Sequence, residues 1–153
     1  MLEEHLRSRL AERDMLLMTH IVMGYPSFDD CRRIVGAMVE AGVDLMELQI
    51  PFSEPIADGP VILRANQRAL ESEATVERCL HFAETVASEF DIPFLVMSYF
   101  NILYRYGLPE FTTTLASAGI RGAIVPDLPT EEAGAYLSAM HDSGIDPIFI
   151  YSP

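Results

Sequence analysis

Glu47 is a carboxylate inside a short apolar run, residues 45–50, which reads Leu-Met-Glu-Leu-Gln-Ile. Burial disfavours the charged form of a carboxyl group and raises its pKa, so such a group becomes a usable acid or base near neutral pH. Gln49 follows two residues later and shares the strand face of Glu47. The alternative interpretation is a Glu47 side chain that points outward to an arginine on a neighbouring helix.

Asp58 is a second carboxylate that could take part in chemistry. It lies in the segment 51–60, which is rich in Pro and Gly and could carry it over the end of the strand. One carboxylate on a rigid strand and one on a loop suit a reaction that moves two protons. Because Asp-Gly is also a common turn sequence, spacing alone leaves both interpretations of Asp58 open.

Five short apolar runs could form the strands that position these groups. Each run is nearly continuous in hydrophobicity, which is typical of parallel strands buried on both faces. The runs cover residues 16–23, 45–50, 94–99, 122–125 and 147–151. Helical patterns, several of them bounded by a capping residue or a glycine, cover residues 2–13, 31–40, 61–70, 75–89, 109–118 and 130–140.

This alternation predicts an α/β fold with a parallel sheet. We expect residues 1–153 to form a single domain with an extra N-terminal helix at about 2–13. The spacing fits either a (βα)8 barrel or a doubly wound sheet. The first predicted strand is not followed by a G-x-G-x-x-G motif, which disfavours the dinucleotide-binding form of the doubly wound sheet.

The composition excludes several functions. The chain has no lysine, which a Schiff-base aldolase, a pyridoxal phosphate enzyme and a Walker A phosphate site all need. Its net charge of −13 argues against nucleic acid and anionic membrane surfaces as partners. Cys31 and Cys79 suggest two reduced structural thiols, and no His/Cys spacing resembles a metal site. The N-terminus does not resemble a signal peptide, so we expect a cytoplasmic protein.

Five segments, in order, resemble the tryptophan synthase α-subunit family. The strongest is 47–60, where Pro-Phe-Ser-Glu-Pro-Ile-Ala-Asp-Gly-Pro follows the strand that carries Glu47. The others are 24–27 (Gly-Tyr-Pro-Ser), 61–70, 97–101 (Met-Ser-Tyr-Phe-Asn) and 125–129 (Val-Pro-Asp-Leu-Pro). The resemblance covers nearly the whole chain. It implies a (βα)8 TIM barrel, and since such a barrel takes eight strands and about 250 residues, we expect an N-terminal partial barrel here.

The resemblance also implies an activity. Members of the family cleave indole-3-glycerol phosphate to indole and glyceraldehyde 3-phosphate by a retro-aldol step without metal or cofactor, in the last stage of tryptophan biosynthesis. Carried over by position, Glu47 would be the acid/base and Asp58 would bind the indole N–H. The absence of lysine is consistent with this chemistry, because the reaction uses no Schiff base.

Further site residues follow from the resemblance. The predicted substrate-binding residues are His20, Gln49, Met97, Tyr99, Ile124, Asp127 and Ile150. As alternatives, the apolar ones and Tyr99 could fill a core, His20 could be a hydrogen-bonded core histidine, and Asp127 could form a turn or cap a helix. The predicted partner-facing residues are Pro51, Phe52, Ser53, Glu54 and Asn101. The family's partner is a pyridoxal phosphate-dependent β subunit, in an expected α2β2 assembly.

Two residues depart from the family pattern. Gln49 stands where the family has glycine, and His20 stands where it usually has an aromatic or apolar residue. We expect these two residues to make the indole pocket smaller and more polar. His20 could then form a hydrogen bond to Gln49 or Glu47, or the substrate could differ from that of the family. Because strands six to eight lie outside residues 1–153, we expect the isolated 153-residue chain to turn over little substrate.

Two other functions remain as alternatives. One is a degenerate, non-catalytic α-like subunit that docks on a β subunit and activates it. The other is a different phosphate-handling (βα)8 enzyme, which the run at 51–59 disfavours.

Overall fold

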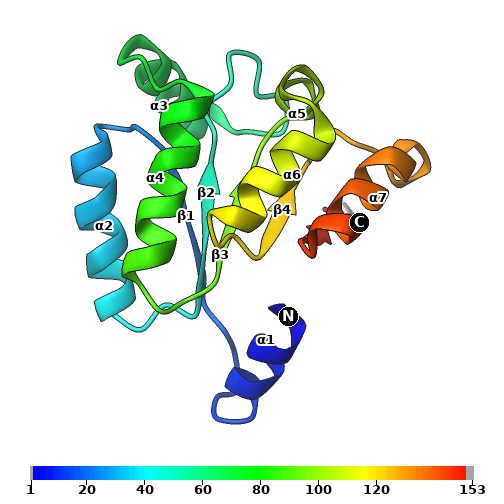
Figure 1. Ribbon diagram of the computed structural model, residues 1–153. Helices are drawn as coiled ribbons and strands as arrows, with labels where there is room; N and C mark the ends of the chain where they lie inside the picture. Colours follow the sequence, from blue (N-terminus) through cyan, green and yellow to red (C-terminus); the bar gives the residue numbers. More distant parts are fainter. Residues whose placement is uncertain (1, 151–153) are drawn as a thin grey trace.

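The structure, a computed structural model, describes residues 2–150 and contains one parallel sheet with five strands in the order β1-β2-β3-β4-β5 (Figure 1). The strands are β1 (Met18–Val22), β2 (Leu45–Gln49), β3 (Phe94–Met97), β4 (Gly122–Ile124) and β5 (Asp146–Ile148). Sequential parallel pairing with a helical connection at each step confirms the predicted α/β fold class. Tyr151, the end of the fifth predicted strand, lies outside the described residues.

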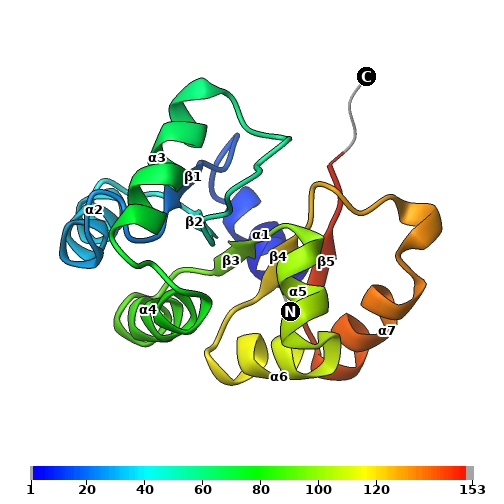
Figure 2. The ribbon, with the colours of Figure 1, turned by 90° about the horizontal axis from the view of Figure 1, so that it is seen from above.

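Helices α2, α4, α6 and α7 cover one face of the sheet, and the strands follow a curved path inside them (Figures 1 and 2). The helices are α1 (Leu2–Leu10), α2 (Phe28–Glu40), α3 (Pro60–Glu71), α4 (Val76–Glu89), α5 (Phe100–Tyr106), α6 (Leu108–Ser117) and α7 (Gly134–Ser143), with the 3-10 turn η1 (Thr130–Glu132) before α7. Among residues 2–150, none of these helices combines the length and hydrophobicity needed to cross a membrane.

Two helical predictions were incomplete. The sequence pattern did not reveal α5, a short helix without a side-chain cap of its own; its first N–H, on Phe100, donates to the Asp127 carboxylate after β4 at 2.9 Å. A tertiary contact therefore supplies the cap that the local sequence lacks. The helix predicted over 130–140 instead begins as η1 and continues as α7 from Gly134.

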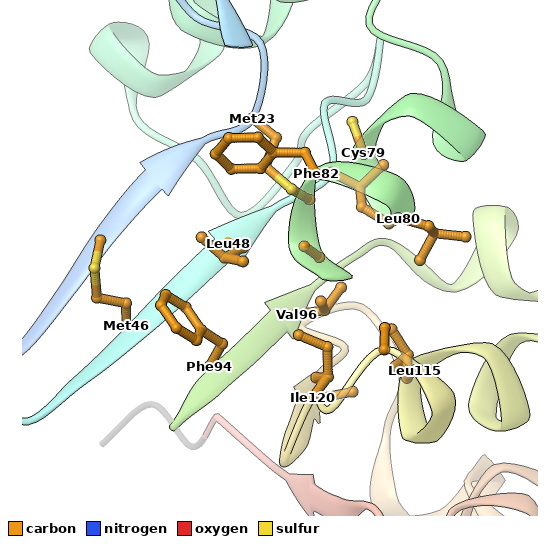
Figure 3. Close-up of a cluster of buried hydrophobic side chains, with 14 of the residues drawn as sticks. Met23, Met46, Leu48, Cys79, Leu80, Phe82, Phe94, Val96, Leu115 and Ile120 are labelled. Carbon is orange, nitrogen blue, oxygen red and sulfur yellow. The ribbon is translucent and has the colours of Figure 1, made fainter. Parts of the chain in front are cut away.

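The main hydrophobic core lies between the sheet and its outer helices (Figure 3). Met46 and Leu48 of β2 face this core, where they join Phe82 of α4 and Leu115 of α6. Successive strand residues point to opposite faces, so Leu45, Glu47 and Gln49 share the other, inner face of β2. Cys31 and Cys79 are free and buried in the outer core.

The inner face has a second, smaller apolar cluster. It contains Leu45, Leu95, Met97, Tyr99 and Ile124, and Leu2 of α1 packs against them. The Leu2 N–H donates to Asp146 Oδ2 at 3.1 Å, at the start of β5. Helix α1 therefore covers the inner face at the end where the strands begin, which leaves the opposite end for the polar residues of β2.

Candidate functional site

Strand pairing brings His20 and Glu47 together on the inner face. His20 of β1 is the register partner of Glu47 of β2, and Gln49 lies one inward position further along β2. Gln49 is in turn the register partner of Met97 of β3. These residues approach the carboxyl ends of the strands, where active sites of α/β proteins are found.

Glu47 is a mostly desolvated carboxyl group. Its side chain is 16% exposed, and its burial raises the pKa, an effect that the charge of Asp58 reinforces and that of His20 opposes. Glu47 Oε1 lies 3.9 Å from His20 Nε2, too far for a hydrogen bond. The side chain of Glu47 thus lies on the inner face near His20 and Asp58, rather than pointing to an arginine of an outer helix. A carboxyl group with a raised pKa can hold and release a proton near neutral pH.

Asp58 is held in place by two side-chain amides. Its Oδ2 accepts a hydrogen bond from Gln49 Nε2 at 2.7 Å and another from Asn66 Nδ2 at 3.3 Å. Gln49 also has its Oε1 2.7 Å from His20 Nε2. The expected hydrogen bond between His20 and Gln49 is therefore present, and it extends to Asp58.

The loop between β2 and α3 is fastened at two further points. The Ala57 N–H donates to the Tyr99 hydroxyl at 3.1 Å, and the Phe52 N–H donates to Asn66 Oδ1 at 2.8 Å. The rings of Phe52 and Tyr99 stack with centroids 5.1 Å apart. Burial raises the pKa of Tyr99 to about 12, so its hydroxyl stays protonated at neutral pH.

Asn66 is the residue of this site that sequence reasoning missed. It is fully buried on α3 between Ala65 and Ala69, which are also buried. A polar residue on the buried stripe of an amphipathic helix needs partners, and that pattern was the available signal. Asn66 uses its amide for Phe52, Asp58 and its own helix at Ile62 O.

The remaining predicted substrate-binding residues occupy different environments. Met97 and Ile124 are buried in the inner cluster. Asp127 accepts from the Phe100 N–H, so it caps α5 as the alternative interpretation held. Ile150 lies beyond the end of β5 and is 62% exposed, while Ile148 packs against the inner cluster instead.

The predicted partner-facing residues divide into two groups. Ser53, Glu54 and Asn101 are exposed. Pro51 is buried, and Phe52 stacks on Tyr99 and packs against the inner cluster, so neither side chain is on the exposed surface of the loop.

Three apolar side chains on the segments that follow β2 and β3 are exposed, which the sequence patterns did not indicate. Ile56 of the loop is 82% exposed, Val61 at the start of α3 is 69% exposed and Tyr104 of α5 is 72% exposed.

A profile of the family described as tryptophan synthase alpha chain matches residues 6–153. The chain belongs to the tryptophan synthase alpha chain family. It is 61% identical over 153 residues to the tryptophan synthase alpha chains of Syntrophotalea carbinolica and of Desulforapulum autotrophicum. All of this chain is covered in both comparisons, and it spans 60% of the length of each relative.

The fold of this chain is also similar to that of solved tryptophan synthase structures. The structure superposes on tryptophan synthase from M. tuberculosis with a TM-score of 0.93 at 35% identity, covering 98% of this chain and 60% of that one. The alpha subunit from Legionella pneumophila gives a TM-score of 0.91 at 31% identity, covering 95% of this chain and 56% of that one. The five strands therefore correspond to the N-terminal part of the TIM barrel of the tryptophan synthase alpha chain.

Proposed function

We propose that the protein carrying this segment cleaves indole-3-glycerol phosphate to indole and glyceraldehyde 3-phosphate, the α reaction of tryptophan synthase. The observation that carries the proposal is the juxtaposition of a desolvated Glu47 and an amide-held Asp58 at the carboxyl ends of the strands. Because the chain spans 60% of its relatives' length, the activity is proposed for the whole protein.

Glu47 has the environment that a proton-transfer group in this reaction requires. The bond that breaks joins carbon 3 of the indole ring to the hydroxyl-bearing carbon of the glycerol phosphate chain. Carbon 3 of the ring gains a proton and the side-chain hydroxyl loses one. The hydroxyl-bearing carbon becomes the aldehyde of glyceraldehyde 3-phosphate. A carboxyl group with a raised pKa can deliver the first proton and help to remove the second.

Asp58 would act on the indole nitrogen. As carbon 3 is protonated, the ring becomes an indolenine and positive charge develops at the nitrogen. A carboxylate that accepts the ring N–H stabilises this charge, and a prealigned carboxylate does so without reorganising during the reaction. The hydrogen bonds from Gln49 and Asn66 supply that alignment.

Phosphate binding is assigned to the part of the protein outside these five strands. In (βα)8 barrels a phosphate commonly binds at the loops after strands seven and eight. We therefore expect residues 1–153 to supply the acid–base pair and to show little turnover when isolated.

The exposed apolar residues support docking of a partner at the same end. Ile56 of the loop that carries Asp58 is 82% exposed, and Tyr104 of α5 is 72% exposed. A β subunit seated there would receive the indole directly from the site. The same surface would also serve a non-catalytic subunit that only activates its partner, which is the second candidate function.

Two substitutions in the full native gene product test the proposed activity. Glu47→Gln and Asp58→Asn should each lower indole release from indole-3-glycerol phosphate by about 10²–10⁴-fold. Glu71→Gln, a change on the exposed side of α3, is the matched control and should leave the rate unchanged. Undiminished indole release by Glu47→Gln would refute the proton-transfer role of Glu47, and a wild-type protein that releases no indole would refute the lyase.

The Asp58→Asn variant also separates the two candidate functions. If the protein is a lyase, this variant should lose indole release and still stimulate the β subunit. A wild-type protein that stimulates the β subunit without any Glu47-dependent indole release would instead establish the non-catalytic function.

A further inference from the structure

Gln49 connects His20 on β1 to Asp58 in the loop before α3. Its amide nitrogen lies 2.7 Å from Asp58 Oδ2, and its amide oxygen lies 2.7 Å from His20 Nε2. The residue is 0% exposed. A buried amide is favourable only when both of its ends have partners, and here His20 and Asp58 satisfy both.

The partners determine the direction of each hydrogen bond. An ionised carboxylate only accepts, so the amide atom that faces Asp58 is the nitrogen. The amide oxygen then faces His20, and it can only accept, which requires a proton on His20 Nε2. Glu47 Oε1 lies 3.9 Å from the same nitrogen, so this proton is directed to Gln49 and not to Glu47.

Asp58 is held through one oxygen by two different elements. Gln49 on β2 and Asn66 on α3 both donate to Oδ2. Oδ1 accepts from neither amide, and a carboxylate oxygen is a strong acceptor for an N–H group. The two amides therefore fix the orientation of the Asp58 carboxylate through Oδ2, and the Tyr99 hydroxyl is a further hydrogen-bonding neighbour of Asp58.

We propose that Gln49 is a positioning residue for Asp58, with its own amide oriented by His20, rather than a residue that contacts the substrate. The inference rests on the proposed function, in which Asp58 accepts the indole N–H. Each end of the Gln49 amide already has a partner, and the side chain is 0% exposed, which favours a positioning role over direct contact with substrate. Alignment of a group that acts on developing charge affects kcat more than KM.

Gln49→Met, made in the full native gene product with its β subunit present, tests this role. Methionine matches the length of glutamine and removes both polar atoms. We expect kcat for indole release to fall about 10- to 100-fold while KM changes by less than about threefold. A rise in KM with kcat unchanged would show that Gln49 contacts the substrate and would overturn the proposal. Gln67→Met, at an exposed position of α3, is the matched control.

A double-mutant cycle tests whether Gln49 acts through Asp58. If it does, Gln49→Met should add less than about a twofold loss to Asp58→Asn, because the group being positioned has already been altered. Losses that multiply in the double variant would show an independent role for Gln49 and would refute positioning through Asp58.

The imidazole of His20 provides a readout that does not depend on activity. Long-range ¹H–¹⁵N NMR of the native gene product should show neutral His20 with its proton on Nε2, and Gln49→Met should weaken that preference. A neutral His20 with its proton on Nδ1 would refute the hydrogen-bond chain. If the wild-type protein shows no Glu47-dependent indole release, the proposed function fails, and the NMR measurement still tests the hydrogen bond between His20 and Gln49.

Discussion

At the scale of single residues, Glu47 occupies a position where a charged side chain lowers the stability of the fold. Glu47 lies between Leu45 and Gln49 on the inner face of β2, where its side chain is 16% exposed. An apolar or neutral residue there would avoid the desolvation of a charge. The carboxyl group is therefore best explained by chemistry that needs a raised pKa, and its cost to the fold should be measurable.

We predict that Glu47→Gln stabilises the protein at pH 8. The pKa of Glu47 in the folded state is above its usual value of 4.5 because of burial, so ionisation favours the unfolded chain as the pH rises through that folded-state pKa. Glutamine stays neutral and avoids this loss. The variant should have a larger free energy of unfolding than the wild type at pH 8. The two free energies should become equal below pH 4.5, the usual pKa of a glutamate.

Urea unfolding of both proteins at several pH values would measure this difference. The control is Glu71→Gln on the exposed side of α3, which should show no such pH-dependent gain. A Glu47→Gln variant that is less stable than the wild type at pH 8 would contradict the prediction.

At the scale of elements, the loop between β2 and α3 is held by residues from two neighbours, α3 and the segment after β3. Asn66 on α3 binds the Phe52 N–H near the start of the loop and the Asp58 carboxylate near its end. Tyr99 after β3 binds the Ala57 N–H between them. The loop is therefore aligned by side chains that lie outside it, and these contacts hold the Asp58 carboxylate in place.

Asn66→Ala should loosen both ends of this loop. The substitution leaves the Phe52 N–H without its side-chain acceptor and Asp58 with one amide donor fewer, so we expect a destabilisation of about 1–3 kcal/mol. Hydrogen exchange of the Phe52 amide should accelerate, and indole release should fall as well. Gln67→Ala, at the exposed neighbouring position, is the control. Its Phe52 amide exchange and its indole release should stay near the wild-type rates. Unchanged Phe52 exchange would contradict the role given to Asn66.

At the scale of the whole molecule, α1 covers the end of the inner face opposite to the site. Its Leu2 packs into the inner cluster and bonds to Asp146 at β5, while Arg9 and the following Arg13 bind Asp44 at the start of β2. The Asp44 side chain is 1% exposed and also accepts the Leu17 N–H. These contacts join the first residues of the chain to the starts of β2 and β5.

Asp44→Asn should weaken this attachment in a pH-dependent way. The hydrogen bond from the Leu17 N–H, with help from both arginines, holds the pKa of Asp44 below its usual value of 3.8. The charged carboxylate therefore stabilises the fold above that value, and this stability is lost as the pH falls through the lower, folded-state pKa.

The asparagine variant should accordingly have a lower melting temperature at pH 7, and the difference should narrow below pH 3.8. Limited proteolysis at pH 7 should also cut the Asp44→Asn variant near α1 faster than it cuts the wild type. Asp142→Asn, on the exposed surface of α7, should change neither property. Equal melting temperatures of Asp44→Asn and wild type at pH 7 would contradict the assignment.

Local sequence patterns determined much of the fold and the identity of the two carboxylates. Short apolar runs predicted all five strands, and a charge inside one of them identified Glu47, because strand burial and the cost of burying a charge are both local signals. The motif from Glu47 to Pro60 also indicated the family that the comparisons then established.

The tertiary structure decided which groups touch. The cap of α5 comes from Asp127 on another element, the buried Asn66 binds the loop from α3, and Gln49 joins His20 to Asp58. Each of these contacts joins segments separated in the chain by a helix, a strand or a loop. Their geometry depends on strand register and helix packing, which no local pattern specifies.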